Sequence, residues 1–428
     1  MLEEIERRRD DLVELCAELI GYDTSARGLG ERPGEEAALQ AHLARRLRGA
    51  ALEVELWVPE PEAVAGVTVP PGFSFDGRPQ LLARRPGSGG GRSLLLNGHV
   101  DVVPPGPEDA WTAPPRSARL RDGRLYGLGA CDMKGGVAAM VVAVEALAAM
   151  RAETAGDLLV NTVTDEESTG AGTAAVVTRG VPVDAAVIPE PTGLDVWTGS
   201  RGAGIVTITV PGRTGHAGLG REDSDPAPAV NAIDATVPLL LALQRLRDDW
   251  RSVAALAHPL LGTGDLVPIS IEAGDWLVTH PSSCRLRCHI SFTPSQADDR
   301  GLGGPVRHEL EQRVAAAAAQ DPWLRANPPH IEWSAGVPTA EVPADHPIVE
   351  TLRRAAADLG RGGRISSRTT WYDGVTLTRS GIPTVACGPG DIAHAHAVDE
   401  FVPVDELVAT AQCLALTVLR FCGPSRRA

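Results

Sequence analysis

The 428-residue chain has little positive charge and no long apolar run. Lysine and arginine total 40 against 55 aspartates and glutamates, which gives a formal net charge of −15. Nucleic acids and anionic membranes bind through basic patches, so we expect neither as a partner. No apolar stretch approaches the roughly 20 residues of a membrane-spanning helix, and the first residues lack the apolar core of a signal peptide. We therefore expect a cytoplasmic protein without a leader.

Two common kinds of site are also missing from the sequence. The seven cysteines are scattered and form no C-x-x-C pair, so we interpret them as reduced thiols rather than as a zinc knuckle or a disulfide framework. No G-x-S-x-G stretch is present, which disfavours a Ser–His–Asp hydrolase.

Continuous apolar strands alternate with helical patterns before residue 200 and again after residue 336. Strands are predicted at 93–100, 157–164, 184–191 and 382–388, with helices between them. This alternation indicates an α/β fold with a mostly parallel sheet that helices cover on both faces. Residues 60–92 are rich in proline and glycine, and we predict an irregular segment there.

Residues 200–336 follow a different pattern. Strands and helices are predicted there in the order β-α-β-β-α-β, which is the split βαβ unit of ferredoxin-like folds. We therefore expect a catalytic α/β domain made of 1–199 and 337–428. Residues 200–336 are expected to form an inserted α+β domain.

Carboxylates and imidazoles follow predicted strands, or precede a helix, at five places. In open α/β sheets, ligands bind at the carboxyl ends of the strands, so these side chains are expected on one rim. The five places are His99 with Asp101, Asp132, the run 165–167, Glu190, and His394 with His396.

Each place also has a purely structural interpretation. His99 and Asp101 lie on one face of a strand, so a structural pair is as good an interpretation as a metal ligand with its orienting carboxylate. Asp132 precedes a helix, and capping is favoured if that position is taken alone. Taken together, mixed nitrogen and oxygen ligands suit zinc, with cobalt or manganese as substitutes. A carboxylate that bridges two ions would complete a two-metal set for hydrolysis.

The motifs GHVDVVP, GACDMKGG, DEES, PEPTG and HAVDE stand in this order along the chain. They resemble those of the di-zinc metallohydrolase family that includes aminoacylase, acetylornithine deacetylase, succinyl-diaminopimelate desuccinylase and related carboxypeptidases. The resemblance implies two zinc ions per chain, Glu166 as general base and Asp101 as the residue that orients His99. The metal ligands that it implies are His99, Asp132 as the bridge, Glu167, Glu190 and His396.

The stretch GRTGHAG resembles the family's lid motif, whose histidine polarises the substrate carbonyl, often in the partner subunit's active site. His216 takes that position. The resemblance therefore implies a homodimer that forms through the inserted domain. It also implies hydrolysis of the amide bond of a small N-acyl amino acid, with a dipeptidase or carboxypeptidase as the alternative. A member that only binds a ligand is disfavoured, because the base and all ligand positions are kept.

The departures from the family pattern concern the substrate. Many relatives have an arginine where this chain has Ser291-Phe292, and another where it has Gly374-Val375. Those arginines are candidates for holding a substrate carboxylate. Arg201 and Arg287 are weak candidates to replace them, so the acyl group and side-chain preference of relatives do not transfer to this chain.

Overall fold

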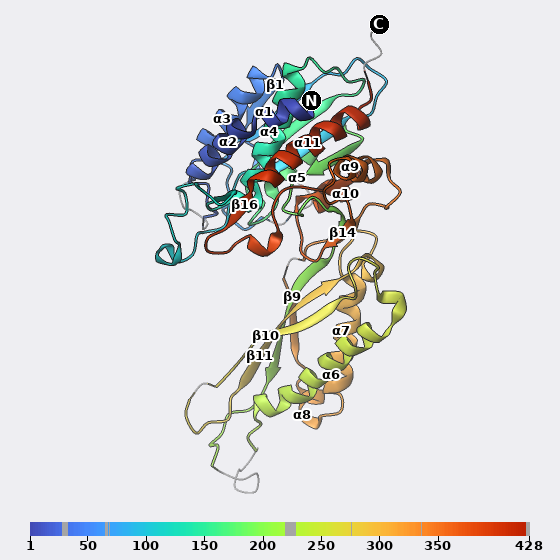
Figure 1. Ribbon diagram of the computed structural model, residues 1–428. Coiled ribbons are helices and arrows are strands. Elements are labelled where there is room, and N and C mark those ends of the chain that lie inside the picture. The colour runs from blue at the N-terminus through green and yellow to red at the C-terminus, as the bar shows by residue number, and fades with distance from the viewer. Residues whose placement is uncertain are drawn as a thin grey trace. The chain divides into compact units, whose positions relative to one another are not determined.

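The computed structural model describes residues 1–27, 33–64, 67, 69–218, 228–274, 276–334 and 336–424. The chain divides into two units (Figure 1). Unit 1 comprises Met1–Thr198, Val342–Ser367 and Tyr372–Ala428, and unit 2 comprises Gly199–Glu341 with Arg368–Trp371. Among the described residues, no helix is both long enough and apolar enough to cross a membrane.

Unit 1 is organised around a sheet with strand order β1-β2-β6-β3-β7-β15-β8-β13, and β14 pairs with β8. The four central strands β6, β3, β7 and β15 run parallel, and the strands on either side pair antiparallel. This arrangement confirms the predicted α/β class. The strands are β1 (Glu53–Trp57), β2 (Gln80–Arg85), β3 (Leu94–His99), β6 (Leu158–Val163), β7 (Ala185–Ile188), β8 (Val196–Ser200), β13 (Ala340–Glu341), β14 (Ile365–Arg368) and β15 (Thr384–Ala386).

The prediction of an irregular segment at 60–92 is wrong for β2. This strand pairs antiparallel with both β1 and β6. One of its two partner strands, β6, lies far away in the sequence. Whether a segment forms a strand depends more on such partner strands than on the preferences of its own residues. Residues 65, 66 and 68 of the segment lie outside the described part of the chain.

Helices cover both faces of this sheet. The amide of Asn97 in β3 donates to Thr173 in α5, whereas the Cα of the next residue, Gly98, faces Val137 in α4. Because successive strand residues point to opposite faces, α4 and α5 lie on opposite sides. The helices of unit 1 are α1 (Leu2–Arg7), α2 (Arg9–Gly21), α3 (Glu36–Gly49), α4 (Gly135–Ala149), α5 (Ala171–Thr178), α9 (Pro347–Asp358), α10 (Asp373–Arg379) and α11 (Val404–Phe421).

Two-sided burial explains the composition of the central elements. Every residue of β3 and β6 is buried. Helix α4 is apolar around most of its circumference, because α2, α3 and α11 pack on it on the side away from β3. A second, small sheet of unit 1 has the order β16-β5-β4, with β4 (Arg119–Arg121), β5 (Arg124–Tyr126) and β16 (Phe401–Pro403).

Unit 2 is a four-stranded antiparallel sheet of order β10-β11-β9-β12. Its elements follow the β-α-β-β-α-β order of the split βαβ unit. Helices α6 and α7 pack together, and their apolar side chains share one core with the sheet, centred on Ile208, Leu243 and Leu310. The elements are β9 (Gly202–Pro211), α6 (Ala232–Ser252), β10 (Asp265–Ala273), β11 (Ser283–Phe292), α7 (Gly304–Ala318), α8 (Pro322–Ala326) and β12 (His330–Trp333).

Candidate metal centre

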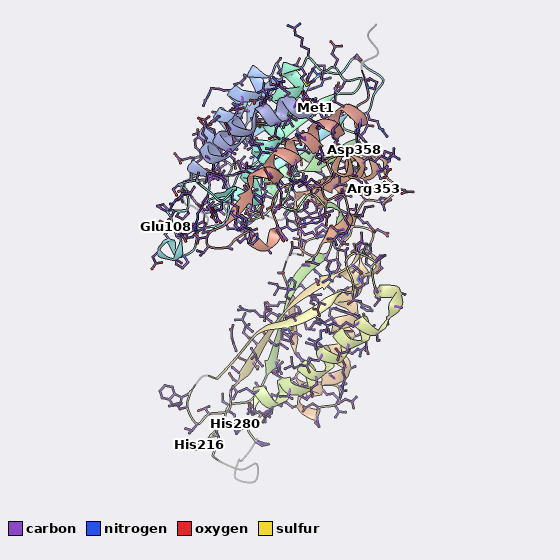
Figure 2. All side chains as sticks on the ribbon, viewed as in Figure 1. Met1, Glu108, His216, His280, Arg353 and Asp358 are labelled. Carbon is purple, nitrogen blue, oxygen red and sulfur yellow. The ribbon has the colours of Figure 1, made fainter. Side chains whose placement is uncertain are left out.

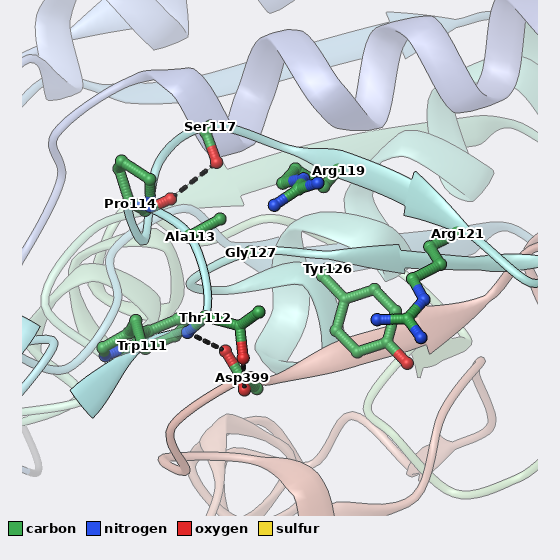
Figure 3. A pocket seen from close by; sticks show the side chains of 10 residues that line it. All are labelled: Trp111, Thr112, Ala113, Pro114, Ser117, Arg119, Arg121, Tyr126, Gly127 and Asp399. Atoms are coloured by element: carbon green, nitrogen blue, oxygen red, sulfur yellow. Dashed lines mark hydrogen bonds between the residues drawn. The ribbon is translucent and has the colours of Figure 1, made fainter. Parts of the chain in front are cut away.

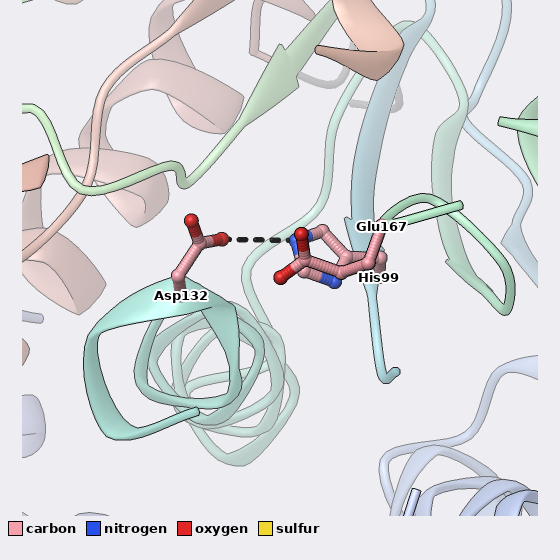
Figure 4. Close-up of side chains that lie close together, drawn as sticks. All are labelled: His99, Asp132 and Glu167. Carbon is pink, nitrogen blue, oxygen red and sulfur yellow. Dashed lines mark hydrogen bonds and ion pairs between the residues drawn. The ribbon is translucent and has the colours of Figure 1, made fainter. Parts of the chain in front are cut away.

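The polar rim of unit 1 forms where parallel strands end. His99 is the last residue of β3, and Glu167 follows the end of the neighbouring strand β6. Asp132 lies just before α4, which packs on β3. The potential ligand atoms of these three residues lie within 4.8 Å of one another (Figure 4). Side chains from three separate stretches of sequence therefore converge on one point.

The carboxylate of Asp132 lies between two imidazoles. His99 Nε2 is 3.0 Å from Asp132 Oδ1, and His396 Nε2 is 3.7 Å from Asp132 Oδ2. The two oxygens of one carboxylate thus face a different histidine each, which is the arrangement that a bridging ligand between two ions requires. His396 lies on a loop after β15, and its Nε2 also lies 3.1 Å from the Glu167 carboxylate.

Glu166 also approaches the Nε2 atom of His99. Its carboxylate is 3.9 Å from His99 Nε2, and its side chain is 9 % exposed. Two consecutive glutamates therefore contact two different histidines. Asp165, the first of the three adjacent carboxylates, turns away and pairs with Arg78 at 3.1 Å.

Asp101 contacts His99 in a different way from the expected one. The ring nitrogen Nδ1 of His99 lies 2.9 Å from the backbone carbonyl oxygen of Asp101 and 3.7 Å from its carboxylate. A carbonyl oxygen only accepts, so this contact places the proton on Nδ1 and directs Nε2 toward Asp132. The Asp101 carboxylate instead accepts the backbone N–H groups of Glu166 and Glu167, at 3.2 and 3.0 Å.

The cluster is strongly anionic and largely buried. Burial raises the pKa of Glu166 well above its usual range and also raises the pKa of Glu167. Burial alone would lower the pKa of His99, but its hydrogen bond with Asp132 and the charges of Glu166 and Asp101 raise it well above normal. The hydrogen bond to Glu167 raises the pKa of His396.

These donors fit divalent cations. Two imidazoles and several carboxylates within a few ångströms are a typical zinc ligand set, and dications would offset the repulsion among the acidic groups. Glu190, which follows β7, is buried, and its charge contributes to the raised pKa of Glu166. His394 is exposed, and its ring packs on Phe401 with centroids 4.4 Å apart. Of the two histidines in this stretch, His396 alone is within 4 Å of the cluster.

Sequence reasoning missed two acidic residues beside this centre. The carboxylate of Glu400 accepts the backbone N–H groups of Gly129, Cys131 and Asp132, so it shapes the turn that presents Asp132. Burial raises the pKa of Glu400 to about 7. Glu400 is the last residue of the motif HAVDE, but only the histidine of that motif was interpreted as a site residue.

Asp373 is the second missed residue. It is fully buried at the start of α10 and accepts a 2.7 Å hydrogen bond from Thr173. Burial raises its pKa to about 7, and the charges of Asp101 and Glu190 add to the shift. In the comparison of this stretch with relatives, only the missing arginine stood out. No local sequence pattern distinguishes a buried aspartate from an exposed one.

The remaining predicted residues belong to unit 2. His216 is exposed beside the β10–β11 connection, near His280 (Figure 2), and its Nδ1 accepts the N–H of Gly218. The guanidinium of Arg201 donates to the carbonyl oxygen of Leu261, and that of Arg287 lies 3.8 Å from Glu272. Both weak candidates for a carboxylate-binding arginine thus have partners within the protein.

Residues 95–420 match peptidase family M20/M25/M40. The chain is 26% identical to the N-formyl-4-amino-5-aminomethyl-2-methylpyrimidine deformylase of Halalkalibacterium halodurans, over 99% of this chain and 97% of that protein. It is 30% identical to the acetylornithine deacetylase of Vibrio parahaemolyticus, over 81% of this chain and 85% of that protein. The crystal structure of a tripeptidase from Staphylococcus aureus superposes with a TM-score of 0.73 at 18% identity, covering 97% and 98% of the two chains, and shows the same fold.

Proposed function

The chain belongs to peptidase family M20/M25/M40 and is a hydrolase of amide bonds, and on that premise we propose that it cleaves a small N-acyl amide at a two-metal centre in unit 1. One observation carries the proposal. Asp132 directs its two carboxylate oxygens at two histidines, and each histidine also lies within 4 Å of one of two consecutive glutamates. A purely structural His–Asp pair would not require a second histidine and two glutamates around the same aspartate.

The residues divide into holders of metal and a base. His99, Asp132, Glu167, Glu190 and His396 would hold two zinc ions, with cobalt or manganese as substitutes. The chemistry that two such ions supply is Lewis acidity, which lowers the pKa of water and polarises a carbonyl. Glu166 takes a proton from the attacking water and delivers it to the leaving amine. Asp101 holds the Glu166–Glu167 backbone and, through its carbonyl oxygen, the ring of His99.

The proposed substrate class rests on two supports. One relative that spans nearly the whole chain is a deformylase of an aminomethylpyrimidine, and another relative deacetylates an amino acid. Both remove a small acyl group from an amine. A formyl or acetyl amide of a small amine or amino acid is therefore the proposed substrate, and a dipeptide is the alternative at the same site.

We propose that unit 2 forms a homodimer and brings His216 to an oxyanion. Strand β10 is an edge strand, and edge strands readily pair with another chain. It exposes Val267, Ile269 and Ile271, of which Ile271 is 55 % exposed. The adjacent helix α6 exposes Val237 and Leu241, four residues apart on one helix face. A second copy that covers these side chains accounts for them.

We also propose that the protein works in the cytoplasm. All seven cysteines are free and buried, which fits a reducing compartment.

A substrate screen tests the proposed activity. Zinc-loaded protein is assayed on formyl, acetyl and succinyl amides of amino acids and of small arylmethylamines, together with dipeptides. Release of amine from formyl or acetyl amides, at least tenfold faster than from dipeptides, is the expected result. Preferential cleavage of dipeptides would replace the proposal with a peptidase, and no turnover of any amide would contradict it.

A further inference from the structure

Unit 1 contains a cavity of about 250 Å³ that the metal centre does not use (Figure 3). It lies against the small sheet, and none of its lining residues is among the proposed metal ligands. The side chains that matter here are those of Trp111, Thr112, Arg119, Arg121, Tyr126 and Asp399. We call this cavity the arginine pocket.

The register of the small sheet places cations and aromatic rings on one face. Arg119 pairs with Tyr126, and Tyr126 pairs in turn with Phe401 on the next strand. Arg121 pairs with Arg124, so three arginines share the face with the two rings. The Tyr126 and Phe401 ring centroids are 5.2 Å apart, and Arg124 stacks on Phe401 at 4.5 Å.

The charged side chains that line this pocket are mostly positive, whereas the formal net charge of the whole chain is −15. Arg119 forms no ion pair with any residue in the described part of the chain, and the ion pair of Arg121 with Asp122 is largely exposed to solvent. Asp399 is the acidic residue of the lining. Both of its oxygens are already engaged by the N–H and hydroxyl of Thr112, at 2.8 and 2.6 Å. The pocket therefore offers guanidinium donors beside a ring surface.

We propose that the arginine pocket binds a small oxyanion that carries a planar ring, such as an aryl phosphate or aryl carboxylate. Guanidinium groups bind phosphate and carboxylate in a bidentate manner and also stack on rings. Tyr126 supplies one ring surface. Trp111, which is 9% exposed, lines the pocket too, with its indole N–H held by the carbonyl oxygen of Pro105. The volume suits a single ring with its substituent.

The pocket is connected to the metal centre through one short segment. Asp399 lies between His396, a proposed ligand, and Glu400, whose carboxylate holds the backbone of Asp132. Gly127 lines the pocket and donates its N–H to the carbonyl oxygen of Glu400. A ligand that shifts the Thr112–Asp399 contact will therefore act on His396 and on Glu400, which lie before and after Asp399 in the sequence. By linkage, metal loading and ligand binding must change each other's affinity by the same factor.

Isothermal titration of phenyl phosphate into zinc-loaded full-length protein tests the site. We expect saturable binding that weakens at least tenfold in the double variant Arg119→Ala/Arg121→Ala. The control Arg353→Ala/Arg354→Ala removes two charges of α9 that are ion-paired with Glu350, and it should bind like the wild type. Thermal melting of each variant checks that the fold is kept.

The ring requirement is tested separately. Tyr126→Phe should bind phenyl phosphate like the wild type, Tyr126→Leu should bind it several-fold more weakly, and inorganic phosphate should bind more weakly than phenyl phosphate. Equal affinity for inorganic phosphate would overturn the ring part of the proposal. Absence of saturable binding would overturn all of it, as would binding that survives in Arg119→Ala/Arg121→Ala but is lost in His99→Ala.

Discussion

The sheets of the two units are exposed to solvent in opposite ways. In unit 1, β3 and β6 are buried along their whole length, and polar side chains gather where the strands end. In unit 2, residues 283–290 of β11 alternate between buried and more exposed positions, and the edge strand β10 presents apolar side chains to solvent. A sheet covered on both faces leaves only its ends for chemistry. A sheet with an uncovered edge leaves a surface for association.

Metal removal should produce the largest effect, and it should be confined to unit 1. Chelation is expected to abolish turnover, and zinc or cobalt should restore it, because the buried carboxylates of the centre need cations to offset their repulsion. Elemental analysis should find two ions per chain after reloading. Activity that is insensitive to chelators would contradict the metal mechanism.

The second effect tests the base. Glu166→Gln keeps the shape of the side chain but cannot accept the proton, so kcat should fall about 10²–10⁴-fold while metal content stays at the wild-type level. Glu14→Gln, at an exposed position of α2, is the matched control. Turnover within threefold of the wild type would remove Glu166 from the role of base.

The third effect concerns the support beneath the ligands. Asp101→Ala removes the acceptor of the Glu166 and Glu167 N–H groups, so metal affinity should fall about 10–100-fold although no ligand is changed. Competition with a chromogenic chelator measures this affinity, and circular dichroism checks the fold. Since the carbonyl oxygen that contacts His99 survives the substitution, unchanged affinity would show that this backbone contact suffices.

The smallest effect should appear in unit 2. Ile271→Asp places a charge at the exposed edge strand, and in a two-fold interface the change enters twice. Because Ile271 is 55 % exposed, an interface can newly bury about half of it, so each copy loses about half of the roughly 1.5–3 kcal/mol of a fully buried isoleucine. Over two copies this predicts a dimer weaker by roughly 10–100-fold, measured by light scattering over a dilution series.

Leu120→Asp is the control for this change. Leu120 lies on the small sheet of unit 1 and is 60 % exposed. It should leave the oligomeric state as it is. A wild-type protein that is monomeric at all concentrations would contradict the role proposed for β10.

The sequence by itself determined much of unit 1. Leucine runs that end in His99, or in the carboxylates after β6, identify strands and strand ends together, because a strand buried on both faces must be apolar until it reaches the rim. The alternating pattern in 200–336 likewise identified the split βαβ order. These signals are local, and local periodicity is what a single sequence displays.

Only the tertiary structure decided the contacts between distant segments. It showed that the carbonyl oxygen of Asp101, rather than its carboxylate, lies nearest the ring of His99, and that Glu400 reaches back to the turn of Asp132. Likewise, β2 is a strand because β1 and β6 pair with it. The Glu400 contact and the pairing of β2 join segments tens to hundreds of residues apart. The Asp101 carboxylate is engaged by the N–H groups of Glu166 and Glu167, which lie about 65 residues further along the chain. Burial and hydrogen bonding between such segments are collective properties of the packed chain.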